Sequence, residues 1–381
     1  MYEMRFFPFF RCETAEGGKI LLQNGYQAAI QEGNAVQFLL FWSPRMTYKK
    51  PSVPSVHFDA FTASIPNLSG KTFVVTGTTS GTGRVAAKTL AEKGGRVFML
   101  NRPSSRSEAV QQEMDAAYPD GRVTTIDCDL QRFASVREAC AALQKACEKT
   151  GIYALMNNAG IMAMPDEATE DGFDTQMQTN HLSHFLLTKE VYGLLATAAD
   201  IHGDARIVNH SSMARLGVKR LEAKYLEANG GHLGGNGASM LFGGARWTRY
   251  SQTKLANAAF TAALHERLQT ANSKVKALVA HPGWANTELQ VTTGKNGGMA
   301  GGSSVFARFI SQSEEDGTLG LLSCVVLPTA KSGEFYGPGM GMMATKGQAK
   351  AYPLEAKYDN AATRTLIWDK SCAAIGESFD I

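Results

Sequence analysis

The sequence predicts an α/β fold built on a doubly wound parallel sheet of about seven strands, with helices on both faces. Two observations support this prediction. From Gly70 onward, short apolar segments rich in β-branched residues alternate with longer stretches of helical character. A glycine-rich turn also follows the first apolar segment directly. Apolar strands that alternate with helices are typical of a parallel sheet, and right-handed crossovers wind such a sheet outward in both directions.

The individual elements follow from this alternation. Six strands are expected, at residues 72–76, 96–100, 123–127, 153–156, 206–209 and 276–281. The helices expected between them lie at residues 84–93, 105–117, 135–149, 173–195 and 250–268. Each strand is short, and most are largely apolar, as is typical of strands buried on both faces.

Composition indicates a globular protein with a sizeable core, because 44% of the 381 residues are hydrophobic and 19% are charged. The net charge of +3 includes no long run of one sign, so charge gives no reason to expect a nucleic-acid partner. The six cysteines form no CxxC pair, which favours free thiols in a reducing compartment, and no spacing typical of a metal site occurs.

Nothing in the sequence predicts a membrane span, because no stretch approaches the roughly 20 apolar residues that a spanning helix needs. The first 30 residues lack the order of a secretory signal. The cytoplasm is therefore the default expectation. Association with an organelle and peripheral contact with a membrane stay open.

Residues 1–66 differ in pattern from the rest of the chain. Their periodicity is mixed, and they end in the linker-like stretch Lys49-Lys50-Pro51-Ser52-Val53-Pro54. We expect residues 1–66 to be an N-terminal extension and linker, either packed on the main domain or disordered. Residues 67–381 are expected to form one domain, with a glycine-rich insert near 213–249.

A dinucleotide-binding turn is predicted at residues 76–83, which read Thr76-Gly77-Thr78-Thr79-Ser80-Gly81-Thr82-Gly83. Gly77 permits the tight turn after the strand. Gly81 and Gly83 let the backbone and the helix N-terminus approach a pyrophosphate. Because the turn lies between a predicted strand and a predicted helix, it indicates a Rossmann-type fold, with Thr79 and Ser80 among the cofactor-binding residues.

The end of the second strand favours NADP(H) as the cofactor. A carboxylate would bind the 2′-hydroxyl of NAD there, but the strand ends in Leu100-Asn101-Arg102. The Arg102 guanidinium can pair with the 2′-phosphate of NADP, and Arg84 supplies a second charge just after the last glycine.

Tyr250 and Lys254 form the candidate proton-transfer pair. Hydride transfer at a carbon requires a proton to move at the attached oxygen, and a tyrosine pKa near 10 is too high for ready exchange at neutral pH. Lys254 lies four residues later, on the same helix face, so its positive charge favours the phenolate.

Several motifs occur together and in one order. Asn157-Asn158-Ala159-Gly160 follows the fourth strand, Ser211-Ser212 follows the fifth, and Tyr250 and Lys254 form a YxxxK motif. His281-Pro282-Gly283-Trp284 follows the sixth strand. With the TGxxxGxG turn, this set resembles the short-chain dehydrogenase/reductase family over residues 70 to about 340. Within that resemblance, residues 332–337 match the last strand of the family.

The resemblance implies further roles. Ser212 would hydrogen-bond the substrate oxygen, Lys254 would contact the nicotinamide ribose, and Asn180 would support a water that leads protons to the lysine. The residues it places along the cofactor are Asp129, Leu130, Asn158, Ala159, Gly160, Pro282, Gly283 and Thr287. Relatives often pair through the helices that bear Asn180 and Tyr250. A homodimer is therefore an open expectation, which the insert could block.

The substrate is expected to be a small molecule of bulky, apolar character. Ser212 and Tyr250 are 38 residues apart, further than in compact family members, and the insert holds seven glycines among residues 230–244. Glycine makes such a segment pliable, while Met240, Leu241, Phe242 and Trp247 offer apolar cover. The alternative reading of the insert is an unstructured surface loop.

Longer inserts occur in two branches that this chain resembles, the retinol-dehydrogenase-like enzymes and light-dependent protochlorophyllide reductase. Residues 237–244 are similar to the second branch, but Trp284 stands where that enzyme has a functional cysteine. We therefore expect carbonyl–alcohol interconversion on a retinoid-like substrate, with C=C reduction of a chlorophyll precursor as the alternative. A non-catalytic NADP-binding scaffold is a second alternative.

Overall fold

The computed structural model describes residues 12–15, 19–22, 26–29, 53–238, 244–285, 293, 311–339 and 345–381. The chain divides into two compact units, Met1–Thr47 and Tyr48–Ile381. In the first unit, strands β1 (Cys12–Ala15), β2 (Lys19–Leu22) and β3 (Tyr26–Ala29) form an antiparallel sheet. All predicted site residues belong to the second unit.

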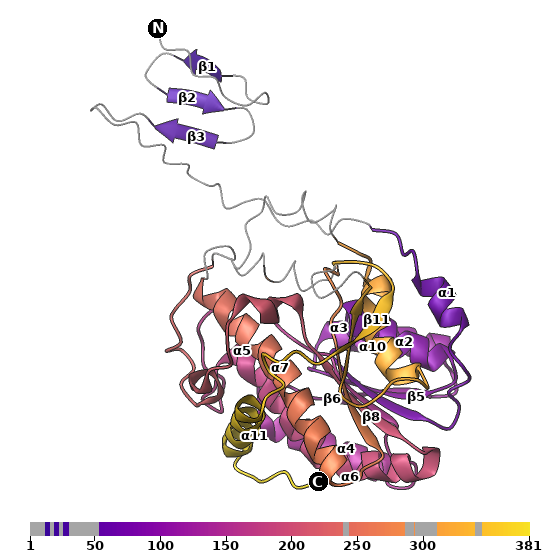
Figure 1. Cartoon of the computed structure of the whole chain (residues 1–381). Helices are drawn as coiled ribbons and strands as arrows, with labels where there is room; N and C mark the ends of the chain where they lie inside the picture. The colour runs from indigo at the N-terminus through magenta and orange to yellow at the C-terminus, as the bar shows by residue number, and fades with distance from the viewer. Residues whose placement is uncertain are drawn as a thin grey trace. The chain divides into compact units, whose positions relative to one another are not determined.

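The second unit is built on an eight-stranded sheet in the order β11-β10-β9-β8-β7-β4-β5-β6 (Figure 1). Its strands are β4 (Thr72–Thr76), β5 (Arg96–Asn101), β6 (Val123–Asp127), β7 (Ala154–Asn157), β8 (Ala205–His210), β9 (Val275–Ala280), β10 (Glu334–Pro338) and β11 (Ala349–Pro353). Strands β4 to β10 are parallel, and β11 pairs antiparallel with β10. The predicted Rossmann-type α/β fold is confirmed.

The number of strands was underestimated by one, because β11 has no apolar signature. Its sequence is AKAYP, and no residue in it is fully buried. An edge strand with a single neighbour can remain polar, so hydrophobic patterning does not detect it. β11 forms through its pairing with β10, in which Phe335 lies opposite Tyr352.

The helices cover both faces of the sheet (Figure 1). Phe73 and Val75 of β4 belong to a core shared with α2 (Gly81–Glu92), α3 (Ser105–Ala117) and α10 (Glu314–Val326). Val74, between them in sequence, belongs to a second core on the opposite face. The helices of that face are α4 (Phe133–Cys147), α6 (Ser183–His202), α7 (Ala245–Thr270) and α11 (Ala361–Ile375). This alternation follows from the period of two along a strand.

Two predicted helices differ from those observed. The helix expected at 173–195 is interrupted: α5 (Thr175–Met177) is followed by a π-helical turn, η1 (Gln178–Leu182), and only then by α6. The π turn places Asn180 in a widened part of the helix, a feature often found at functional sites. Helix α7 starts at Ala245, so Tyr250 lies in its second turn rather than at its start.

Part of the expected N-terminal extension packs on the main unit. The Asp316 carboxylate of α10 accepts hydrogen bonds from the Ser55 hydroxyl (3.1 Å) and from the Val56 and His57 amides (2.9 Å each). Helix α1 (Phe58–Ala63) also contacts α10. The expected domain boundary at residue 66 stays a prediction. Within the described part of the chain, no helix combines the length and apolar character that crossing a membrane requires.

The insert after β8 contains two short 3₁₀ helices, η2 (Met213–Gly217) and η3 (Ala223–Leu226). Its residues 239–243, which include the predicted apolar cover Met240, Leu241 and Phe242, lie outside the described residues.

The order of the strands reverses between β4 and β7. These two strands are neighbours in the sheet, although β5 and β6 separate them in sequence. Ligands of such sheets bind beyond the carboxyl ends of the strands at this switch point.

Candidate active site

A cavity of about 680 Å³ lies at the switch point of the sheet. The residues that line it come from the glycine turn, from the ends of β5 to β8, from the insert and from α7. The predicted site residues among them are Gly77, Thr79, Ser80, Gly81, Arg102, Asp129, Leu130, Asn158, Ala159, Gly160, Ser212, Tyr250, Lys254, Pro282 and Gly283. Thr287 lies outside the described residues. The fold thus gathers most of the predicted residues around one cavity.

The glycine turn is held in a defined shape. Gly77 and Gly81 have φ values of +71° and +60°, a region in which side chains are strained. A Cβ atom on Gly83 would lie 2.2 Å from the Gly77 carbonyl oxygen. Gly83 therefore allows the turn to close, although it does not line the cavity.

Asn101 supports the turn from the end of β5, a role that sequence reasoning missed. Its side-chain oxygen accepts a hydrogen bond from the Thr78 amide (2.8 Å), and its side-chain nitrogen donates to the Thr78 hydroxyl (2.8 Å). Asn101 thus lies at the strand end where a carboxylate would hydrogen-bond the ribose of NAD. The signal in the sequence was the asparagine at the strand end.

The basic end of the cavity contains two arginines. Arg102 and Arg106 line it, and among the described residues neither guanidinium forms a hydrogen bond or an ion pair. Arg84 instead forms an ion pair with Glu113 of α3 and does not line the cavity. Arg106, in the first turns of α3, was not predicted. Its position four residues after Arg102 is the signal that could have identified it.

Tyr250 and Lys254 lie side by side and buried, next to Ser212. Burial raises the pKa of Tyr250 to about 12, and contact with the Ser212 hydroxyl opposes this increase. Burial lowers the pKa of Lys254 to about 8. The Lys254 ammonium lies 5.8 Å from the centre of the Tyr250 ring and donates to the His210 carbonyl oxygen at 3.0 Å. Burial rather than Lys254 thus dominates the pKa of Tyr250 here, so the expected lowering by Lys254 stays a prediction.

Asn180 is buried behind the cavity rather than lining it. Its amide nitrogen donates to the Ile161 carbonyl oxygen and to the Thr253 hydroxyl, both at 2.9 Å, and its amide oxygen accepts from the Ile161 amide at 2.8 Å. A Cβ atom on Gly160 would lie 3.2 Å from the Asn180 amide oxygen and 3.3 Å from the Lys254 ammonium. Asn180 therefore connects the loop after β7 to helix α7.

His184 links Asn180 to the glycine turn. Its Nδ1 lies 3.1 Å from the Asn180 carbonyl oxygen, and its Nε2 lies 2.9 Å from the Thr76 hydroxyl. Because a carbonyl can only accept, the proton belongs on Nδ1, and Nε2 accepts from Thr76. Burial lowers the pKa of His184 to about 4, so the ring is neutral at physiological pH.

The far end of the cavity is apolar. Met162, Met164, Met213, Leu216, Trp247, Trp284 and Ala285 line it. The Trp247 ring packs edge-to-face against Tyr250, with 6.0 Å between the ring centres and an interplanar angle of 83°. Leu216 is 38% exposed, a large fraction for an apolar side chain among the described residues. This end suits an apolar molecule whose reacting atom lies at Tyr250.

Comparison with known proteins agrees with this geometry. The model of the short chain dehydrogenase family matches residues 71–225. Human retinol dehydrogenase 11 is 32% identical over 252 residues, which cover 66% of this chain and 73% of the relative. Human retinol dehydrogenase 13 is 36% identical over 243 residues, but these cover only 64% of that relative, slightly less than two thirds of its length.

A solved structure extends the match. An uncharacterized protein from Mycobacterium paratuberculosis is 30% identical, with a TM-score of 0.63 and coverage of 87% of this chain and all of that one. The fold, the order of the motifs and these relatives agree. This chain therefore belongs to the short-chain dehydrogenase/reductase family of oxidoreductases.

Proposed function

We propose that this protein is an NADP(H)-dependent oxidoreductase that interconverts a carbonyl and an alcohol on a bulky apolar substrate. The observation that supports this proposal best is the continuity of one cavity. It runs from the two arginines at one end, past Tyr250, to the methionine- and tryptophan-lined end. A charged cofactor and an apolar substrate can therefore meet at a group able to transfer a proton.

The residues at the basic end fit the cofactor. The glycine turn offers backbone amides and the N-terminus of α2 to the pyrophosphate. Arg102 and Arg106 can bind the 2′-phosphate, and no carboxylate lies at the end of β5 to repel it. When bound, NADPH supplies the hydride. Two arginines that pair with no other described residue favour NADPH over NADH.

The protein supplies the proton. Because the pKa of Tyr250 is raised, its hydroxyl is protonated at neutral pH and can donate to the oxygen of a carbonyl that is being reduced. The Ser212 hydroxyl lies beside it and can donate a hydrogen bond to the same oxygen. Lys254, with a pKa of about 8, is mostly protonated at pH 7, and its charge stabilises the phenolate that remains.

The apolar end supports a retinoid-like substrate. Its aromatic and methionine side chains offer dispersion contacts and few hydrogen bonds, so a long hydrocarbon with a single oxygen fits best. The names of two relatives, retinol dehydrogenases 11 and 13, agree with an apolar alcohol or aldehyde of this class.

The first test is NADPH oxidation by the purified protein in the dark. Retinal, other apolar aldehydes and ketones, and protochlorophyllide are the substrates, with an illuminated duplicate of each reaction. We expect dark turnover of the apolar carbonyls and higher KM values for NADH than for NADPH. Turnover of protochlorophyllide alone, and only under light, would replace this proposal with the C=C reductase alternative. NADPH binding without turnover of any substrate would favour the non-catalytic scaffold.

A further inference from the structure

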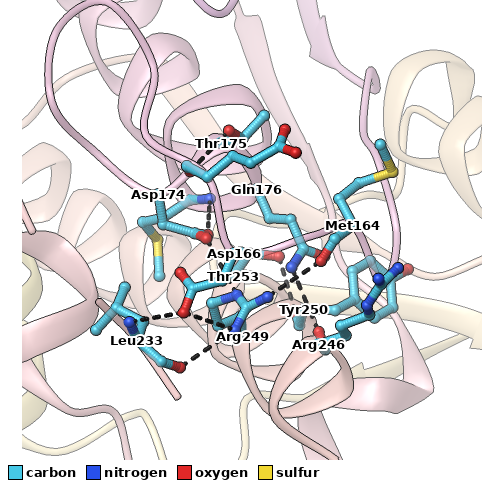
Figure 2. Close-up of polar contacts among 12 residues, drawn as sticks. Met164, Asp166, Asp174, Thr175, Gln176, Leu233, Arg246, Arg249, Tyr250 and Thr253 are labelled. Carbon is cyan, nitrogen blue, oxygen red and sulfur yellow. Dashed lines mark hydrogen bonds and ion pairs between the residues drawn. The ribbon is translucent and has the colours of Figure 1, made fainter. Parts of the chain in front are cut away.

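Arg249 lies directly before Tyr250 on α7, and its side chain is completely buried. Figure 2 shows the contacts that converge on its guanidinium. Nη1 donates to the carbonyl oxygens of Gly235 (2.8 Å) and Leu233 (3.2 Å), and Nη2 donates to that of Met164 (3.1 Å). The mechanism proposed above gives this residue no role.

Two buried carboxylates complete the cluster. Asp166 Oδ2 lies 3.5 Å from Nη1 of Arg249, and Asp174 Oδ2 lies 3.2 Å from its Nε. Burial raises the pKa of Asp174 to about 6, and its contact with Arg249 opposes this change. Burying three ionisable groups is costly even when they are paired, so the cluster is not explained by stability alone.

The cluster holds residues 233–235, a turn within the glycine-rich insert, in place. Asp166 Oδ2 accepts hydrogen bonds from the amides of Leu233 and Gly235, both at 2.8 Å. Arg249 binds the carbonyl oxygens of the same two residues. Four hydrogen bonds from buried ions thus fix this turn from both sides. The pliable insert expected from the glycine content is, at residues 233–235, a fixed loop.

The same contacts fix the substrate end of the cavity. Met162 and Met164 line it, and Arg249 binds the backbone of Met164 while Asp166 follows two residues later. Asp174 caps α5 by accepting from the Met177 amide at 2.9 Å, so the cluster also joins α7 to the segment that leads to Asn180. One side chain therefore connects the loop after β7, the insert and the helix of Tyr250.

We propose that Arg249, with Asp166 and Asp174, is a positioning and specificity-determining residue of the substrate site. By binding the Met164 carbonyl oxygen and by fixing residues 233–235, which do not themselves line the cavity, it holds the methionine wall of the apolar end at one distance from Tyr250. The wall then selects substrates by bulk. This inference rests on the proposed function for the class of substrate, but the fixed wall itself is independent of turnover.

The test compares R249M and R249K with R206M in the full chain. Arg206 is a matched control, because it is also a buried arginine that donates to two carbonyl oxygens, those of Cys324 (2.9 Å) and Leu327 (2.8 Å), and pairs with Asp204. It does not line the cavity. Both Met variants lose a buried arginine, so their thermal unfolding reports the general loss of stability. Changes in KM or in substrate preference that R249M shows and R206M does not are therefore due to the position of Arg249, not to the general loss of stability.

For R249M we expect the KM for retinal to rise about tenfold while the Kd for NADPH stays within twofold, because only the wall changes. The preference for retinal over a short aliphatic aldehyde should fall by a similar factor. R249K should recover only part of the loss, since an ammonium keeps the charge but cannot bridge the same carbonyl oxygens. R206M should keep the wild-type KM and preference. Equal KM changes in R249M and R206M, or none in R249M, would overturn the proposal.

Amide hydrogen exchange separates this inference from the proposed function. Exchange at residues 230–238 should be faster in R249M than in the wild type, because Asp166, which accepts from the Leu233 and Gly235 amides, loses its partner Arg249, and the turn loses two hydrogen bonds to its carbonyl oxygens. Exchange there should be unchanged in R206M. This result is expected even if no carbonyl substrate is turned over, in which case only the proposed function fails. Wild-type exchange in R249M would refute the fixed wall whatever the activity.

Discussion

The Nε2 atom of His181 lies 2.9 Å from the Ser371 hydroxyl and joins the turn that carries Asn180 to the C-terminal helix α11. Around this contact, α11 lies beside α7 and packs against it (Figure 1). Trp368 stacks on Phe379 with 5.0 Å between ring centres and meets Phe185 edge-on at 5.4 Å. Helix α11 therefore packs on α7, one of the helices through which a homodimer was an open expectation.

We predict that W368A lowers the free energy of unfolding by about 3 kcal/mol, as truncation of a buried tryptophan usually does. It should also promote self-association, because loosening α11 uncovers the apolar side chains of α6 and α7. Urea unfolding and sedimentation velocity measure the two effects. K370A is the control, since Lys370 forms only an exposed pair with Glu227. A wild-type protein that already sediments as a dimer would contradict this prediction.

Local patterning predicted the parts of the fold that depend on neighbouring residues. The apolar strands and the glycine turn are short-range features, and the structure has them where they were expected. Tyr250 and Lys254 lie on one helix, α7, but their catalytic roles stay a prediction. Arg102 was identified for the same reason, because it directly follows the strand β5.

Features created by long-range contacts were not predictable. Arg249 looks in sequence like a solvated cation on a helix, and only the tertiary structure brings Asp166 and Leu233 to it. The interruption of the helix at Asn180 likewise has no glycine or proline to announce it. Arg84 was predicted to contact a phosphate from its position after the glycines; in the structure it pairs with Glu113, and its role in cofactor binding stays a prediction.

The two cavity arginines provide a prediction about the cofactor. R102A and R106A should each raise the Kd for NADPH about tenfold or more, because each removes a charged hydrogen bond to the 2′-phosphate. Binding of NADH, which lacks that phosphate, should change less than twofold. R84A is the matched control, because Arg84 pairs with Glu113 outside the cavity. Nucleotide titration followed by fluorescence gives the values, and equal losses for both nucleotides would argue against 2′-phosphate recognition.

Buried histidines predict a loss of stability in acid. Burial lowers the pKa of His181 and His281 to about 3 and that of His184 to about 4, and it lowers the pKa of His210 as well. The pKa of each ring is therefore lower in the folded protein than the value of about 6.5 in the unfolded chain. The contribution of these neutral rings to the free energy of unfolding is fully present above pH 6.5 and decreases as the pH falls from there toward 4. Each histidine should contribute about 2 kcal/mol of loss between pH 7 and pH 5.

Asp174 acts in the opposite direction, because its raised pKa of about 6 makes protonation favourable to the folded state below that value. The histidines outnumber it, so the net change in acid is destabilising. Urea midpoints at pH 7.5 and 5.0 measure the dependence. H181N should reduce the difference between the two urea midpoints by the contribution of one histidine. H232N should leave that difference unchanged, because His232 is exposed. A midpoint that does not fall in acid would show that these rings are already charged in the folded protein.

Lys254 predicts how the rate of reduction depends on pH. Its pKa of about 8 means that the ammonium is lost as the pH rises through 8, together with the charge that stabilises the Tyr250 phenolate after proton donation. We expect kcat/KM for carbonyl reduction to be constant below pH 8 and to fall above it, with a slope of one. K254M should have a lower, flat profile, and persistence of the fall in K254M would assign it to another group.

Tyr250 provides the most direct test of the chemistry. Y250F removes the only hydroxyl that this residue can offer to the substrate oxygen, so we expect kcat to fall at least 100-fold, within the range usual for loss of a general acid. The Kd for NADPH should stay within several-fold, because the ring and its edge-to-face contact with Trp247 remain. Stopped-flow single turnovers with saturating NADPH isolate the chemical step from product release. Unchanged turnover in Y250F would mean that the proton comes from elsewhere, and Ser212, which shares the cavity, would be the next residue to replace.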